Sequence, residues 1–205
     1  AFDGKDSQYV NAEGHDATGR FLPYWVRSGD KIIVEPLLEL ETSDYYALPK
    51  SLKQEVVIDP YIYPIDGVDT LLTSAVAPIL VDGKFYGIAG VDLAVDFLQK
   101  SVEEIALSAD NENVTIVSYQ GLIVADKKNP GLSGQPLEKL HADWEADLTK
   151  VQGGEVAIEE DEGNILIFSP IKFGKTTTPW SYMVSVPRSE VTRRALQATL
   201  SLVII

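Results

Sequence analysis

One acidic residue, Asp92, stands in a stretch that is otherwise apolar, and it is the clearest candidate for chemistry in this chain. The stretch runs from Ile88 to Leu93, after Ala77-Pro78-Ile79 and a Gly83-Lys84 turn. Removing a carboxylate from water is costly unless it meets a partner. We therefore interpret Asp92 as a candidate contact for a polar ligand.

A second, degenerate copy of the same hairpin lies near the end of the chain. Ser169-Pro170-Ile171, then Gly174-Lys175, then a strand from Trp180 to Val186 repeat the order of the first copy. A repeat of this kind indicates two related modules. The second copy has Val and Pro where the first has Asp92, so we expect only the first module to hold the polar ligand.

Other reactive chemistry has little support in the sequence. The chain contains no cysteine, which excludes disulfides, thiolate catalysis and zinc–sulfur sites. The only two histidines, His15 and His141, are far apart in sequence, so we expect neither a metal site nor a cofactor. There is no Ser-His-Asp order and no pair of catalytic acids, and we do not expect this chain to be an enzyme.

The composition of the chain indicates which classes of ligand and partner it can bind. The 205 residues are 45% hydrophobic and 23% charged, which is typical of a globular protein with one large or two small domains. The formal net charge of −14 argues against binding of nucleic acid through phosphate contacts. A negative surface favours cationic or zwitterionic small ligands instead.

Strands and turns alternate through the first half of the chain and must position Asp92. We expect a connector over residues 41–50, closed by Pro49, and a helix over residues 93–107 that links the two modules. The expected strands cover residues 21–27, 32–34, 56–58, 61–64, 71–80 and 85–92, with turns at 28–31, 66–67 and 82–83.

The second half repeats the mixture of strands and helices. A helix is expected over residues 136–150, with Leu137, Leu140, Trp144 and Leu148 on one face, and another after Pro187. The expected strands cover residues 114–119, 122–125, 154–159, 164–171 and 180–186. Antiparallel strands with helices to one side predict an α+β fold.

The chain ends in an apolar run from Ala195 to Ile205, preceded by Arg193-Arg194. A membrane-spanning helix needs about 20 apolar residues, and this run has roughly half that length. We interpret residues 189–205 as the first turns of a transmembrane helix. The alternative is a buried or amphipathic terminal helix.

Four motifs follow one another in an order that resembles a known family. They are Gly19-Arg20-Phe21-Leu22-Pro23-Tyr24-Trp25-Val26-Arg27, Asp44-Tyr45-Tyr46-Ala47-Leu48-Pro49-Lys50, Asp59-Pro60-Tyr61-Ile62-Tyr63 and Gly87-Ile88-Ala89-Gly90-Val91-Asp92-Leu93. The order resembles the double Cache, or tandem PAS-like, extracytoplasmic sensor domain of bacterial and archaeal chemoreceptors and sensor histidine kinases. The family domain opens with a long helix from a first membrane span, which has no counterpart in this sequence.

The resemblance implies two PAS-like modules, each an antiparallel sheet flanked by helices, with a terminal helix leading into the membrane. We expect a membrane-distal, ligand-binding module over residues 1–108, a membrane-proximal module over 109–188 and the membrane segment over 189–205. It further implies a domain outside the cytoplasm, anchored to the membrane through flanking helices, and a homodimer in the full-length receptor. The ligand would be a small molecule, often an amino acid or an amine.

The resemblance also implies a site. In the amino-acid-binding members, an aromatic pair on the connector and an Asp at the end of the last strand contact the ligand ammonium, which places Tyr45, Tyr46 and Asp92 in those roles. An ammonium group needs acceptors and a countercharge, and aromatic rings add cation–π attraction. Four further aromatic residues would complete a cage, namely Tyr24, Trp25, Tyr61 and Tyr63. These four could equally pack the face of the sheet, and Asp92 could cap the following helix.

This sequence departs from the amino-acid pattern at the carboxylate clamp. Ser43 stands where that pattern has an Arg, and Tyr63 stands where it has a second acid. We therefore expect an amine or quaternary ammonium ligand, with Glu41 as an additional countercharge or a solvated loop acid. Arg20 or Arg27 could still reach a ligand carboxylate or form structural ion pairs.

Four kinds of protein are open on the sequence, one of which is a structural adhesion module with an unused pocket. A transmembrane chemoreceptor is the first. A histidine kinase or diguanylate cyclase with the same sensor domain is the second, and a soluble enzyme with PAS-like modules is the alternative from another class.

Overall fold

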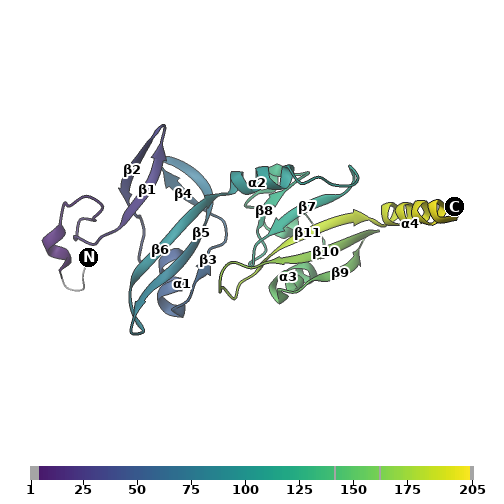
Figure 1. The fold of residues 1–205 in the computed structure, drawn as a ribbon. Coiled ribbons are helices and arrows are strands. Elements are labelled where there is room, and N and C mark those ends of the chain that lie inside the picture. Colours follow the sequence, from purple (N-terminus) through teal and green to yellow (C-terminus); the bar gives the residue numbers. More distant parts are fainter. Residues whose placement is uncertain (1–4, 141, 162, 204–205) are drawn as a thin grey trace. The chain divides into compact units, whose positions relative to one another are not determined.

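Antiparallel strands form the sheets of this protein and helices lie beside them, which confirms the predicted α+β class (Figure 1). The computed structural model describes residues 5–140, 142–161 and 163–203, so His141 lies outside the described residues. Contacts divide the chain into two units, which are described separately. Unit 1 comprises Ala1–Ile58, Ile62–Thr70 and Ala75–Val91, and unit 2 comprises Asp59–Tyr61, Leu71–Ser74 and Asp92–Ile205.

Runs of strands are separated by helices along the described part of the chain. The α-helices are α1 (Asp44–Leu52), α2 (Val95–Glu103), α3 (Trp144–Gly153) and α4 (Arg188–Val203), and the 3₁₀ helices are η1 (Asp6–Tyr9), η2 (Pro130–Leu132) and η3 (Leu137–Lys139). The strands are β1 (Pro23–Ser28), β2 (Lys31–Pro36), β3 (Val56–Val57), β4 (Tyr61–Ile65), β5 (Val68–Val81), β6 (Lys84–Ala94), β7 (Asn113–Val117), β8 (Ile123–Asp126), β9 (Ala157–Asp161), β10 (Asn164–Ile171) and β11 (Trp180–Pro187).

Short turns join the predicted hairpins of the first half. The β1–β2 pair closes at Ser28↔Lys31, around Gly29. The β5–β6 turn is Asp82-Gly83, and both residues have positive φ, at 50° and 74°. Positive φ at both turn residues is the geometry whose twist matches that of the flanking strands, and Asp-Gly is a preferred pair for it. These local signals explain why the sequence located both hairpins correctly.

The connector predicted over residues 41–50 is instead the helix α1, which runs to Leu52. Pro49 lies inside this helix rather than closing the segment. A proline removes one helical hydrogen bond, which is why its presence argued against a helix. Tyr45 exposes only 4% of its surface, and its burial helps to stabilise the short helix. The helix ends at Lys53, whose backbone N–H donates to the carbonyl of Pro49.

The linking helix is also shorter than the expected range of 93–107. It begins at Val95, and its N-cap is Ala94, while Asp92 still belongs to β6. The alternative that Asp92 caps this helix is therefore wrong. Val95, Gln99 and Val102 are buried, at the spacing of one helical face. This face of α2 packs against β8 (Figure 1).

In unit 2 a five-stranded antiparallel sheet has the order β8-β7-β11-β10-β9. The strands predicted in this half are confirmed, including the repeated hairpin, in which Ile171 pairs with Trp180. The helix predicted over residues 136–150 is wrong as a single element, because η3 and α3 are separated by turns at Ala142 and Asp143. Leu137, Leu140 and Trp144 still pack into one core. Their spacing therefore indicated a shared buried face correctly, although the helix is not continuous.

The last helix begins directly after Pro187, as expected. It has 16 residues in the structure. Within the described part of the chain, no helix combines the length and the apolar character required to span a bilayer. The membrane segment predicted over 189–205 and the module boundary predicted at residue 108 stay predictions.

Candidate ligand-binding site

Asp92 takes part in a set of hydrogen bonds that joins three strands. Ser74 Oγ donates to Asp92 Oδ1 at 2.5 Å, and the hydroxyl of Tyr61 lies 2.7 Å from Ser74 Oγ. Ser74 is buried, with 2% of its surface exposed, while Asp92 and Tyr61 are half-buried. Asp92 comes from β6, Ser74 from the centre of β5 and Tyr61 from the start of β4. The charge that stood out in the sequence is thus bound by a hydroxyl network within unit 2.

Three tyrosine rings of unit 1 pack together. The ring of Tyr63 meets those of Tyr24 and Tyr45 edge-on, with centroids 5.5 and 6.4 Å apart. Tyr45 donates its hydroxyl proton to the carbonyl of Leu38, and the Leu38 N–H donates to the Tyr63 hydroxyl at 3.0 Å. Tyr45 and Tyr63 therefore hold the segment after β2 in place. For Tyr63 the packing role considered from the sequence is present in the structure.

Two cationic side chains of the protein itself lie over the ring of Tyr46. The Lys50 ammonium lies 5.0 Å from the ring centroid and the Arg20 guanidinium carbon 6.0 Å from it. The ring also packs edge-on against Phe85, with centroids 5.6 Å apart. Both cations lie within the range of cation–π attraction. A cationic ligand at Tyr46 would thus compete with the protein's own side chains.

Glu41 and Trp25 lie on the exposed surface of unit 1. Glu41 Oε1 forms an ion pair with the Arg20 guanidinium at 2.6 Å, so the structural ion pair considered for Arg20 is present. Trp25 exposes 62% of its surface on β1, and Arg27 is exposed two residues further on. Ser43 donates its hydroxyl to the carbonyl of Glu39 at 2.8 Å.

Sequence reasoning missed a second strand-terminal acid, Asp126. It ends β8, is fully buried, and accepts five hydrogen bonds, from Asn113 Nδ2 at 2.8 Å, Thr115 Oγ1 at 2.6 Å, Lys128 N at 3.0 Å, Asn129 N at 2.7 Å and Asn129 Nδ2 at 3.0 Å. An acid after the apolar run Ile123-Val124-Ala125 was the available signal. This strand lies outside both repeated hairpins.

Asp59 is a further half-buried acid of unit 2, two residues before Tyr61. Its Oδ2 accepts a hydrogen bond from the backbone N–H of Gln120 at 3.2 Å. Burial raises the pKa of the Asp59 carboxyl, and hydrogen bonds from Ser118 and Gln120 offset part of that rise. Asp59 thereby ties the start of β4 to the β7–β8 turn.

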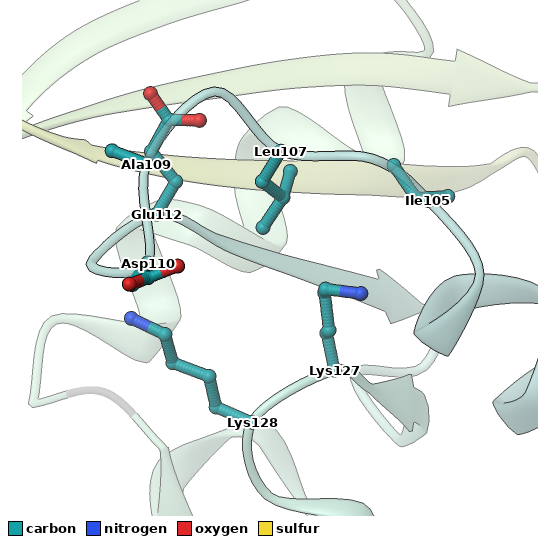
Figure 2. A pocket seen from close by; sticks show the side chains of 7 residues that line it. All are labelled: Ile105, Leu107, Ala109, Asp110, Glu112, Lys127 and Lys128. Atoms are coloured by element: carbon teal, nitrogen blue, oxygen red, sulfur yellow. The ribbon is translucent and has the colours of Figure 1, made fainter.

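A cavity of about 290 Å³ lies between the α2–β7 connection and the residues that follow β8 (Figure 2). Lys127 and Lys128 line one side, and Ile105, Leu107 and Asp110 line the other. None of the predicted site residues lines it. The remaining lining residues are Ala109 and Glu112.

Glu112 lines this cavity and also forms an ion pair with the last helix, α4. It is 4% exposed, and its Oε1 lies 2.6 Å from the guanidinium of Arg194 on α4. Its other oxygen accepts from the Ser108 N–H at 2.9 Å. Within residues 5–140, 142–161 and 163–203, no three His, Cys, Asp or Glu side chains are grouped closely enough to hold a metal ion.

The chain is similar to known sensor proteins over nearly its whole length. A family described as the first PDC sensor domain of methyl-accepting chemotaxis protein-like proteins matches residues 5–100. The methyl-accepting chemotaxis protein TlpQ of Pseudomonas aeruginosa is 28% identical over 96% of this chain. This chain spans only 30% of the length of TlpQ.

Solved structures of sensor domains are also similar to this chain. The extracellular domain of mmHK1S-Z3, described as a histidine kinase, is 30% identical with a TM-score of 0.82, and the alignment covers 96% of this chain and 72% of that one. The ligand-binding domain of the amino acid chemoreceptor PctB of Pseudomonas aeruginosa PAO1, in complex with L-Gln, shares the fold. It is 19% identical with a TM-score of 0.55, over 87% of this chain and 75% of that one.

Fold and similarity together define the class of protein as an extracytoplasmic, ligand-binding sensor domain that is not catalytic by itself. The chain belongs to the double Cache (tandem PDC) family, whose members are the sensor domains of chemoreceptors and sensor histidine kinases.

Proposed function

We propose that this domain senses a small organic cation, an amine or an amino-acid-like ammonium compound, and that Asp92 is its anchor in the membrane-distal module. The observation that carries the proposal is the hydrogen bond from buried Ser74 to half-buried Asp92, with Tyr61 behind it. A carboxylate that accepts a hydrogen bond from a buried strand hydroxyl suits a ligand that brings both positive charge and N–H donors.

The aromatic residues predicted from the sequence take secondary roles in this proposal. Tyr24, Tyr46 and Trp25 supply ring faces, and Tyr45 and Tyr63 shape unit 1 through their contacts with Leu38. Glu41 can act as a countercharge only by leaving its ion pair with Arg20.

The ligand does not require a carboxylate in this proposal. The residue at the clamp position is Ser43, and its hydroxyl is bound to a backbone carbonyl. A hydroxyl cannot replace the two parallel hydrogen bonds and the positive charge that Arg offers to a carboxylate. PctB is a chemoreceptor for amino acids, which carry an ammonium group beside the carboxylate. The shared feature that we transfer to this chain is the ammonium group alone.

In the full-length protein we propose that the domain is anchored in the membrane, forms a homodimer and passes ligand binding to a cytoplasmic output. The similarity to TlpQ favours a chemoreceptor output. A histidine kinase output is the second candidate, supported by the 30% identity to mmHK1S-Z3.

A thermal-shift screen of primary amines, betaines and amino acids on the 205-residue chain tests the ligand class. Because a ligand that binds the folded state stabilises it by mass action, amines should raise the melting temperature. Asp92→Asn should weaken binding of the best amine by at least tenfold in calorimetry, with the melting temperature of the ligand-free chain nearly unchanged.

Asp96→Asn is the matched control, because Asp96 is exposed in the first turn of α2, four residues from Asp92. It should bind the amine as the unmodified chain does. Stabilisation by amino acids alone, or equal amine affinity of Asp92→Asn, contradicts the proposed function.

A further inference from the structure

We propose that the cavity between the α2–β7 connection and the residues after β8 is a second ligand site, which takes a small monocarboxylate with a short apolar tail. All residues that line this cavity belong to unit 2. The inference does not depend on the proposed function, because its ligand has the opposite charge and its residues are different from those around Asp92. No feature of the sequence pointed to this place.

Backbone hydrogen bonds hold both walls of the cavity in place. On one side the Ser108 N–H donates to Glu112 Oε2 at 2.9 Å, and the Glu112 N–H donates to the carbonyl of Ala109 at 3.2 Å. On the other side the Lys127 N–H donates to the carbonyl of Val114 at 2.9 Å. The cavity is therefore formed before a ligand arrives, as is usual for sites that bind small molecules.

The charges around the cavity match one negative charge on the ligand. Glu112 lines the cavity, but its Oε1 lies 2.6 Å from the Arg194 guanidinium, which balances it. Figure 2 shows the ammonium of Lys128 directed towards the carboxylate of Asp110, so these two charges offset each other. The positive charge of Lys127 is then in excess. The net charge of −14 opposes an anion only weakly here, because salt screens charges that are more than about 10 Å away.

Lys127 is the residue that would bind the carboxylate. Its side chain is half-buried and points into the cavity (Figure 2). Its ammonium donates to the backbone carbonyl of Glu103 at the end of α2. An ammonium has three N–H donors, and this bond uses one of them. Because a backbone carbonyl has no formal charge, the bond fixes the direction of Lys127 without neutralising it, and a carboxylate can accept a charge-assisted hydrogen bond from it.

The opposite wall and the size of the cavity favour an apolar tail on the ligand. Ile105 and Leu107 line this wall, and both are half-buried. The volume of about 290 Å³ is at the lower end of the range for small-molecule sites. An aliphatic chain of a few carbons can place its methylene groups against these two side chains, and their removal from water is favourable. Butyrate has this combination of one carboxylate and a short tail.

A nuclear magnetic resonance titration of the isotope-labelled 205-residue chain with butyrate tests the inference. The readouts are the dissociation constant and the backbone amides whose signals shift, which should include those of Leu107 and Lys127. Butyrate should bind about fivefold more tightly than acetate, because its two additional methylene groups leave water. Neither n-butanol, which has no charge, nor n-butylamine, which has the opposite charge, should shift these signals.

Four substitutions assign the roles within the cavity. Lys127→Gln should weaken butyrate binding about tenfold, since it removes one charge-assisted hydrogen bond. Lys128→Gln should also weaken binding, because it leaves the Asp110 charge without a counterpart, and Asp110→Asn should tighten binding. Leu107→Ala should reduce the preference for butyrate over acetate. Lys139→Gln is the matched control, because Lys139 is an exposed lysine of unit 2 that does not line the cavity, and its affinity for butyrate should not change.

The outcomes separate this inference from the proposed function. Asp92→Asn should bind butyrate as the unmodified chain does, so a failure of amine binding leaves the inference standing. The inference is overturned if butyrate at about 50 mM shifts no signal of the cavity, or if acetate and butyrate bind equally. A loss of affinity in Lys139→Gln as large as that in Lys127→Gln would also overturn it, because attraction of anions to any surface lysine then explains the binding. If Lys127→Gln does not fold, Lys128→Gln and Asp110→Asn decide, and changes in the same direction for both are contrary to the inference.

Discussion

Gln99 and Asp126 are joined by two hydrogen bonds that run in opposite directions. Gln99 Nε2 donates to the backbone carbonyl of Asp126 at 2.9 Å, and the backbone N–H of Asp126 donates to Gln99 Oε1 at 3.0 Å. The side-chain amide thus satisfies both backbone groups of the last residue of β8, as a neighbouring strand would. This pairing fastens α2 to the sheet of unit 2.

The Asp126 carboxylate should be a main source of stability in unit 2. Asp126→Ala would leave five buried or half-buried donations without their acceptor, from Asn113, Thr115, Lys128 and Asn129. We expect the free energy of unfolding to fall by about 3–5 kcal/mol, because each buried donor that loses its acceptor costs about 1–3 kcal/mol. Urea denaturation measures it. Asp110→Ala removes an exposed acid and is the control, and a loss below about 1 kcal/mol for Asp126→Ala would contradict the prediction.

The ion pair between Glu112 and Arg194 should couple α4 to the start of β7. Glu112 is 4% exposed, and its carboxylate oxygens contact the Arg194 guanidinium and the Ser108 N–H. We expect a double-mutant cycle with Glu112→Gln and Arg194→Met to give a favourable coupling energy of about 1–2 kcal/mol in unfolding free energy. Additive losses would show that the pair does not hold the helix. Arg188, whose ion pair with Glu160 is exposed on both sides, provides the comparison cycle with a smaller coupling.

Asp59 should make stability fall as pH rises. Burial raises the pKa of its carboxyl, so the folded chain binds this proton more tightly than the unfolded chain, whose pKa is about 3.9. The contribution of Asp59 to stability is complete below the unfolded pKa and is lost as pH rises through the higher folded pKa. The unmodified chain should therefore lose stability relative to Asp59→Asn as pH rises above the unfolded pKa and through the higher folded pKa.

Unfolding measured at a series of pH values for both chains tests this expectation. The difference in unfolding free energy between them is the readout, because it cancels the titration of the other groups. Asp69→Asn removes an exposed acid and controls for the loss of one negative charge. A difference that grows in favour of the unmodified chain as pH rises would show the opposite sign.

Lys50 should compete with the ligand for Tyr46. The Lys50 ammonium lies 5.0 Å from the centroid of the Tyr46 ring. The family resemblance places Tyr46 in the aromatic pair that contacts the ligand. Lys50→Gln should tighten amine binding about threefold, since a cation–π contact at an exposed site is worth about 0.5–1 kcal/mol. Lys84→Gln, which removes a cation from the ring of Tyr86, is the control and should have no effect. Weaker or unchanged binding by Lys50→Gln would place Tyr46 outside the site.

Local signals predicted much of the fold and little of the site. The Asp-Gly turns and the alternation of apolar residues located both repeated hairpins and nearly every strand. The connector around Tyr45 was mistaken for an irregular segment, because Pro49 signals the end of a helix while burial of the tyrosine stabilises one. The helix over 136–150 was mistaken for one element, because two separate helices deliver residues to the same core.

By itself, the sequence determined the α+β class, the repeated hairpin, the family and the exceptional position of Asp92, because all of these depend on residue types at short spacing. Only the tertiary structure decided which side chains Asp92 and Asp126 meet. Ser74 is 18 positions from Asp92 and 13 from Tyr61, and Gln99 is 27 positions from Asp126. Such residues come within hydrogen-bond distance only when strands pair and a helix docks, and neither event leaves a local pattern along the chain.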